Sequence, residues 1–197
     1  MDDLNLPLGQ EPKSKRRAVF EFVWEMVKVA LISLAIILPV RYFLIQPFYV
    51  KGASMEPNFF DHEYLIIDEI SYRFNEPSRG DIAVFKYPND PRQYFIKRIV
   101  GLPGEKVEIK EGKIFINNSE LKESYLPANL QTNLSLIRSY GTVTLANDEY
   151  FLLGDNRDQS LDSRAFGPVK KDYLIGRTWL RGWPFNRLAV FNAPEYK

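Results

Sequence analysis

One apolar segment divides the chain and limits what it can fold into. Residues 26–45 are mostly apolar, with Lys28 and Arg41 near the two ends. As a helix, about 20 residues rise about 30 Å, which matches the hydrocarbon thickness of a bilayer. The basic cluster at 13–17 precedes the segment, and positive charge marks the cytoplasmic side of a membrane span. This order predicts an uncleaved membrane anchor, with the N-terminus in the cytoplasm and the bulk of the chain outside.

Two other interpretations of the apolar segment follow from its length. Its uncharged part, residues 29–40, is short for a span, and a buried core helix or a cleavable signal core has a similar length. A cleavable signal is disfavoured because the preceding region is long and no small-x-small sequence follows. We therefore predict a polar cytoplasmic tail at 1–17, a transmembrane anchor at 18–46 and an extracytoplasmic domain at 47–197.

The composition excludes several classes of protein. Hydrophobic residues make up 45% of the 197 residues, which is typical of a folded chain. The net charge is +1, so no basic field indicates nucleic-acid binding. The chain has no cysteine, which excludes disulfides and thiolate metal sites.

After Gln46-Pro47 the helical pattern stops, and short strands broken by Gly, Pro, Asn and Asp follow. Glu111-Gly112 between two of them is typical of a tight hairpin. The interval 117–147 is polar and weakly patterned. The sequence predicts a mainly β domain with its clearest strands at 64–68, 81–86, 94–100, 106–110, 113–116, 149–153 and 174–179.

Ser54 and Lys97 are the two candidate residues for chemistry. Ser54 lies in a turn shortly after the apolar segment, and Lys97 lies in an alternating strand with Phe95 and Ile99 on its own face. Burial disfavours the charged form of lysine, and a neutral lysine can take the proton of a serine hydroxyl. From the residues alone, a turn serine that bonds only the backbone is the favoured interpretation of Ser54. Alternation also does not exclude that Lys97 is an edge-strand lysine with its charge in water.

Four motifs then resemble those of bacterial type I signal peptidases, and they occur in that family's order. They are Ser54-Met55-Glu56-Pro57, Arg79 to Phe85, Lys97 to Glu105 and Gly154 to Arg164. A single Ser-Met-x-Pro is a weak signal, whereas the four together are very specific. The resemblance runs from the apolar segment to the C-terminus. It implies a β-rich catalytic domain on one N-terminal transmembrane helix, with a small lobe inserted at about 117–147.

The resemblance also implies roles for single residues. Ser54 matches the nucleophile and Lys97 the general base, while Ser160 matches a serine that hydrogen-bonds the lysine amine. Gly52 matches a position where some members carry a serine that assists the oxyanion hole. The Ser54 backbone N–H is expected as one donor, and the resemblance does not indicate which group supplies a second.

Four charged residues match scaffold positions of the family. Asp155 matches an aspartate that pairs with the arginine after the catalytic lysine, here Arg98. Asp162 and Arg164 match a structural ion pair near the site. These charges are expected to hold the loop that carries Ser160 rather than to take part in the chemistry.

The resemblance implies substrates and a location as well. Phe48, Val50, Phe59 and Ile96 match positions that line two shallow substrate pockets, whose bulky walls leave room for small side chains such as alanine. The expected partners are exported preproteins with Ala-x-Ala-like cleavage sites, the lipid bilayer and the protein translocation machinery. The expected location is the cytoplasmic (inner) membrane, crossed once, with the catalytic domain on the outer side.

No cofactor and no metal are expected. Asp61, His62 and Glu63 are adjacent, and adjacent residues on a strand point to opposite faces, so they make a poor chelate. Two rival functions share part of the pattern. A self-cleaving Ser/Lys regulator of the repressor type would need a DNA-binding helical N-terminus, and a non-catalytic β-rich module on an anchor would not need Ser54, Lys97 and Ser160 together.

Overall fold

The fold is seen in a computed structural model that describes residues 15–43, 45–127, 129–133 and 141–192. Most of the predicted tail at 1–17, and residues 128 and 134–140 of the predicted lobe, lie outside the described residues. By its internal contacts the chain divides into two compact units, Met1–Tyr42 and Phe43–Lys197.

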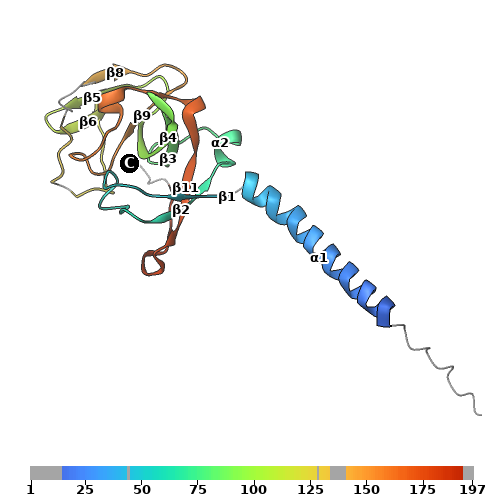
Figure 1. Cartoon of the computed structure of the whole chain (residues 1–197). Helices are drawn as coiled ribbons and strands as arrows, with labels where there is room; N and C mark the ends of the chain where they lie inside the picture. Colours follow the sequence, from blue (N-terminus) through green and yellow to red (C-terminus); the bar gives the residue numbers. More distant parts are fainter. Residues whose placement is uncertain (1–14, 44, 128, 134–140, 193–197) are drawn as a thin grey trace, which may run out of the picture. The chain divides into compact units, whose positions relative to one another are not determined.

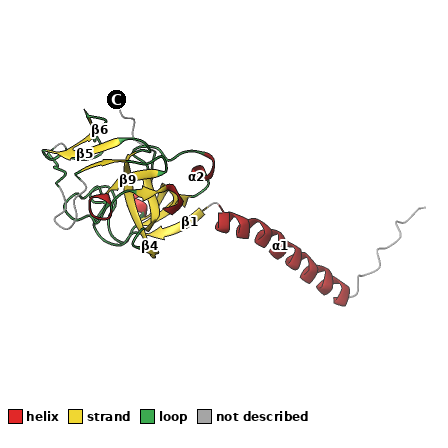
Figure 2. Ribbon diagram, turned by 90° about the horizontal axis from the view of Figure 1, so that it is seen from above, coloured by secondary structure: helices red, strands yellow, loops and turns green. Residues whose placement is uncertain are grey.

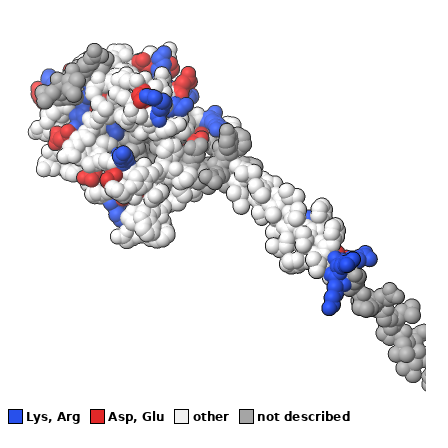
Figure 3. Space-filling model, in the orientation of Figure 1, with Lys and Arg blue, Asp and Glu red and all other residues white. Residues whose placement is uncertain are grey.

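The first unit contains one long helix, α1 (Lys15–Phe43). Large apolar side chains are exposed along it, among them Phe20, Leu31 and Ile36. Figure 3 shows Lys and Arg gathered at its N-terminal end and a surface of other residues along most of its length. Within the part of the chain that the structure describes, no helix combines the length and apolarity that crossing a membrane requires.

The end of α1 differs from the predicted limits of the anchor, 18–46. The helix stops at Phe43 and the first strand, β1 (Ile45–Tyr49), has already begun before residue 46. Pro47 accounts for this, because proline disfavours the helical conformation of the residue before it and cannot continue the helix itself.

The second unit is built on an eight-stranded sheet in the order β1-β2-β11-β3-β4-β9-β10, with β12 paired to β11. All of its pairings are antiparallel. The predicted mainly β domain is confirmed. Its strands are β2 (Tyr64–Asp68), β3 (Ile82–Tyr87), β4 (Asp90–Gly101), β9 (Glu149–Leu153), β10 (Val169–Lys170), β11 (Leu174–Trp183) and β12 (Ala189–Val190).

A second sheet has the order β7-β6-β5-β8. Both views place β5 and β6 at the opposite end of the domain from β1 (Figures 1 and 2). The hairpin between them turns at Glu111 and Gly112, which both have positive φ, as a two-residue type I′ turn requires. The strands are β5 (Lys106–Lys110), β6 (Lys113–Ile116), β7 (Ser119–Glu120) and β8 (Thr142–Thr144). This sheet therefore begins well before residue 117, where the lobe was expected to start.

Short helical turns complete the second unit: α2 (Ser71–Phe74), α3 (Ser163–Phe166), η1 (Lys171–Tyr173) and η2 (Phe185–Arg187). One cluster of the core lies directly under the turn that carries Ser54. It joins Met55 and Phe59 of that turn to strand residues such as Leu65, Ile67 and Val84. Burying one such side chain stabilises the fold by about 1.5–3 kcal/mol, so this turn is held as part of the core.

Candidate active site

The turn around Ser54 is fixed by backbone hydrogen bonds on both sides. Val50 N–H donates to Glu63 O (2.8 Å), and Phe59 N–H donates to Met55 O (2.9 Å). Gly52 has φ +91°, a region that favours glycine. Its N–H donates to Asp61 Oδ1 (2.8 Å). Gly52 thus shapes the turn through its backbone conformation, and its own N–H is already engaged.

Lys97 lies in the middle of β4, opposite Ala83 of β3. Its side chain is only 4% exposed. The Nζ atom lies 2.8 Å from Ser54 Oγ and donates a hydrogen bond to Ile96 O (2.7 Å). It is also 5.4 Å from the ring centre of Phe95, which shares its strand face as predicted. The fold therefore brings together two residues that are 43 positions apart.

The surroundings of Lys97 favour its neutral form. Burial lowers its pKa to about 8, against the opposing attraction of the Asp162 and Asp155 carboxylates. Near neutral pH a minority of the molecules therefore carry an unprotonated Lys97 amine, many more than an unperturbed lysine would allow. A neutral amine can donate to Ile96 O and still offer its lone pair to the Ser54 hydroxyl. The pair can act as a base and a nucleophile.

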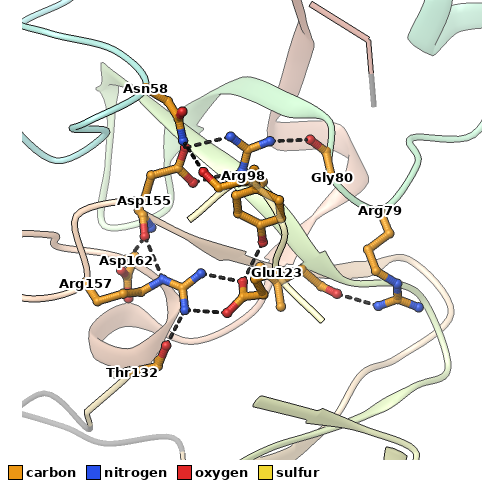
Figure 4. A network of polar contacts seen from close by, with 12 residues as sticks. Asn58, Arg79, Gly80, Arg98, Glu123, Thr132, Asp155, Arg157 and Asp162 are labelled. Carbon is orange, nitrogen blue, oxygen red and sulfur yellow. Dashed lines mark hydrogen bonds and ion pairs between the residues drawn. The ribbon is translucent and has the colours of Figure 1, made fainter. Parts of the chain in front are cut away.

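Arg98, the next residue on β4, is buried as well. Its guanidinium makes two hydrogen bonds to the Asp155 carboxylate (2.8 and 2.6 Å), and Asn58 Nδ2 donates to the same carboxylate (2.8 Å; Figure 4). The face of the guanidinium stacks 3.9 Å from the ring centre of Tyr125. The predicted pair of Arg98 and Asp155 is present, and it joins β4 to the loop after β9.

A second pair of charged groups holds the rest of that loop. Asp162 accepts two hydrogen bonds from the Arg164 guanidinium, both 2.8 Å, and a third from Gly154 N–H (3.1 Å). Arg157 donates to both carboxylate oxygens of Glu123 and to the Thr132 hydroxyl (Figure 4). Glu123 and Thr132 thereby brace the loop that packs against the Ser54 turn.

Ser160 is where the structure departs most clearly from the resemblance. Its hydroxyl is buried and has no hydrogen-bond partner among the described residues, so the implied bond to Lys97 is not formed. The Ser160 side chain instead packs against Gly154: a Cβ added to Gly154 would lie 2.5 Å from Ser160 Cβ and from Ser54 O. The loop is packed so tightly here that Ser160 faces the bare backbone of Gly154.

A cavity of about 520 Å³ opens beside Ser54 and Lys97. Phe48, Val50 and Ile96 line it, as the resemblance implied. Phe59 does not, and its assignment to a substrate pocket is corrected: it is 0% exposed and packs on Phe191 in the core below. Other lining residues that had not been singled out are Tyr49, Lys51, Ala53, Leu65, Val84, Gln93, Tyr94, Gln159 and Leu161.

Neither His62 nor a metal cluster takes part in this arrangement. The His62 side chain is 74% exposed and contacts Asp61. Among the residues that the structure describes, no group of three or more His, Cys, Asp or Glu side chains is placed to hold a metal ion.

Two residues that touch the Ser54 turn were missed by the sequence reasoning. Asp61 accepts the Gly52 N–H, and Asn156 donates to the backbone on either side of Ser54. Asn156 lies within the fourth motif, which was a signal that it belongs to the site, although the sequence indicated no contact for it. Asp61 had been considered only as a possible metal ligand.

Comparison with known proteins agrees with the four motifs. The family model described as "Signal peptidase, peptidase S26" matches residues 23–183. The probable signal peptidase I-2 of Synechocystis sp. is 35% identical over 188 residues, covering 92% of this chain and 83% of that protein. The signal peptidase I P of Bacillus subtilis subsp. natto is 33% identical over 181 residues, covering 89% and 96%.

A solved structure is also similar. The signal peptidase I of Enterococcus faecalis V583 is 35% identical and gives a TM-score of 0.44, covering 52% of this chain and 97% of that one. The family predicted from the sequence motifs is confirmed by the family model and the relatives. The chain belongs to the signal peptidase family, peptidase S26, and is therefore a peptide-bond hydrolase.

Proposed function

We propose that the protein is a membrane-bound serine endopeptidase that removes N-terminal signal peptides from exported preproteins. Ser54 is the nucleophile and Lys97 the general base. The observation that carries this proposal is the contact between the two: Lys97 Nζ, buried and with a lowered pKa, lies 2.8 Å from Ser54 Oγ. Membership of the signal peptidase family supplies the class of substrate.

The reaction proceeds in two halves. Neutral Lys97 takes the hydroxyl proton as Ser54 Oγ attacks the scissile carbonyl carbon, whose oxygen becomes an oxyanion beside the Ser54 backbone N–H. The Lys97 ammonium then protonates the leaving amine, and the mature protein departs. The signal peptide remains as an ester on Ser54. Water, deprotonated by Lys97, cleaves that ester and restores the hydroxyl.

The cavity supports recognition of small side chains. An extended preprotein segment fits between residues 49–53, which carry the turn, and residues 93–96 of β4, because both segments line the cavity. Phe48, Val50 and Ile96 narrow it with apolar walls. Main-chain hydrogen bonds to an added strand would align the substrate, and the pocket would select its alternate side chains.

We expect cleavage after Ala-x-Ala-like sequences. Detergent-solubilised protein incubated with a preprotein should release a product whose N-terminus, read by sequencing, follows such a site. Changing the alanine before the scissile bond to phenylalanine should reduce cleavage by about a hundredfold or more, since the large ring displaces the carbonyl from Ser54. A serine at that position is the control of similar size and should be accepted. Equal cleavage of the phenylalanine substrate would refute the pocket assignment.

We also propose that α1 anchors the protein in the cytoplasmic membrane, with the catalytic domain outside. Three observations support this: the uncharged stretch 29–40, the exposed apolar side chains along α1, and the cations at its N-terminal end (Figure 3). The second unit adds a contiguous group of exposed rings, Tyr49, Tyr64, Trp183 and Phe185. Such aromatic side chains favour the interface between lipid and water. The translocation machinery would deliver the substrates to this surface.

This topology predicts a one-sided pattern of proteolysis. Protease added to intact spheroplasts should digest the domain 47–197 and leave the N-terminal segment protected. Lysing the spheroplasts first should expose both parts and serves as the control. Full protection of the C-terminal domain in intact spheroplasts would contradict the orientation.

A further inference from the structure

Asn156 contacts the backbone on both sides of Ser54. It lies on the loop after β9, 103 positions along the chain from Ala53. Its side-chain Nδ2 donates to Ala53 O (3.1 Å), and its backbone N–H donates to Ser54 O (3.1 Å). One residue of a distant loop therefore holds both peptide groups that flank the candidate nucleophile.

The hydrogen bond to Ala53 O also affects the N–H of Ser54, which belongs to the same peptide group. Ala53 C=O and Ser54 N–H belong to one planar trans peptide group, in which the oxygen and the hydrogen point in opposite directions. Fixing the direction of the carbonyl therefore fixes the direction of the N–H. A bond donated to the carbonyl also polarises the peptide and makes its N–H a better donor.

The Ser54 N–H is available to donate a hydrogen bond to a substrate oxyanion. No acceptor among the described residues takes it, whereas the nearby Gly52 N–H is bound to Asp61. The amide of Asn156 is itself held in one orientation, because Gln159 N–H donates to Asn156 Oδ1 (3.3 Å) and leaves Nδ2 facing Ala53. Ala53 O accepts a second bond from Glu56 N–H (3.1 Å), so removing Asn156 would loosen this peptide rather than release it.

We propose that Asn156 is a positioning residue for the oxyanion hole: it orients the peptide group whose N–H, at Ser54, binds the oxyanion. This inference rests on the proposed function, in which that oxyanion forms. Asn156 touches neither the reacting atoms nor Lys97 in this account. Its effect should therefore appear in transition-state binding and not in the protonation of the base.

Two variants test the proposal. Asn156→Ala removes the side-chain donor, and Asn156→Asp keeps the shape and the acceptor for Gln159 N–H but cannot donate to Ala53 O. Each should lower kcat by about tenfold to a hundredfold with KM nearly unchanged, because loss of an oxyanion donor costs about a hundredfold or more and here the donor is only misaligned. Asp158→Asn, at an exposed neighbouring position, is the control and should match the wild type.

Three further measurements separate positioning from a general structural role. A peptide aldehyde ending in alanine adds to Ser54 and forms an oxyanion, so its inhibition constant should rise in Asn156→Ala by about the same factor as kcat falls. The inhibition constant of the released signal peptide, which forms no oxyanion, should stay within about twofold. The pH at which kcat/KM rises should be unchanged in this variant, since Lys97 keeps its surroundings.

The outcomes test the positioning role of Asn156 separately from the proposed peptidase function on which it rests. Absence of cleavage by the wild-type protein would refute the proposed function. With an active wild type, unchanged kcat in both Asn156 variants would refute the positioning role. A higher KM with unchanged kcat, or a shifted pH limb in Asn156→Ala, would refute it as well and assign Asn156 to substrate binding or to Lys97. If Asn156→Ala unfolds at the assay temperature, the kcat and KM of Asn156→Asp, which keeps the size of the side chain, decide between these outcomes.

Discussion

Lys97→Arg should abolish preprotein cleavage, to the same level as Ser54→Ala. Arginine keeps the positive charge but stays protonated in proteins, so it cannot accept the serine proton. Lys97→Met tests the same point without a buried charge, because methionine has a similar length and suits the apolar surroundings of a side chain that is 4% exposed. Both variants should lose general-base and nucleophilic catalysis together, so the rate of cleavage should fall by several orders of magnitude.

The matched control is Lys110→Arg, at an exposed position on β5. It should keep full activity. Circular dichroism and thermal unfolding of the Lys97 variants establish that they are folded. Substantial cleavage by folded Lys97→Met would falsify the proposed dyad.

The same base predicts the pH dependence of the wild type. Below its pKa Lys97 is charged and could not act as the proposed base, so activity should rise as pH increases through that value. The pH dependence of kcat/KM reports the pKa of the free enzyme. Its rise should have a midpoint near 8, because burial lowers the Lys97 pKa to about that value. An unperturbed lysine has a pKa of about 10.4. The limb of kcat should lie lower, because docked substrate desolvates the amine further. A limb near 10 in kcat/KM would contradict the buried base.

Gly154→Ala should also reduce cleavage strongly, although it adds a single methyl group. That methyl carbon would lie 2.5 Å from Ser54 O and from Ser160 Cβ, a separation that atoms do not tolerate. Either the loop or the Ser54 turn must move. Overpacking of this kind destabilises by about 1–3 kcal/mol. A displacement of about 1 Å at the reacting groups costs on the order of a hundredfold in rate. Initial rates of preprotein cleavage and the melting temperature measure the two effects.

Gly182→Ala is the control for this change. Gly182 lies on β11, and a Cβ there would meet only Tyr64 O, at 4.0 Å, which is an ordinary contact. This variant should retain activity within about twofold. Wild-type rates in Gly154→Ala would show that the loop after β9 can shift without disturbing Ser54, and that its close packing has no bearing on the reaction.

The sequence was most informative where short-range patterns decide the structure. Alternation and turn residues located the strands 64–68, 106–110, 113–116 and 149–153 with the limits that the structure has. Alternation also put Lys97 on a face with Phe95. It did not show that Arg98, on the opposite face, is buried too, because that depends on Asp155 from a loop 57 positions away.

Contacts between segments far apart in the chain could not be predicted from the sequence. Phe59 was assigned to a pocket because it matches a pocket position of the family, yet it is buried, because the turn itself packs on the core. The family resemblance implied a small lobe at about 117–147, and it did not indicate that β5 pairs with both β6 and β8, which joins residues before 117 to residues after 141 in one sheet. The bond from Asn156 to Ala53 O required the actual course of two loops.

The groups gathered at Ser54 come from three parts of the chain: the turn after β1, the middle of β4 and the loop after β9. The residues between them form most of both sheets, so a partly folded chain has a serine, a lysine and an asparagine but no base within reach of a nucleophile. Contacts over such separations form slowly, because the entropy of closing a long loop is lost before the contact stabilises the chain. Hydrolytic activity should therefore emerge in a single step at the end of folding. If Ser54 and Lys97 act as proposed, a newly made molecule should be unable to cleave the chains around it until its own domain is complete.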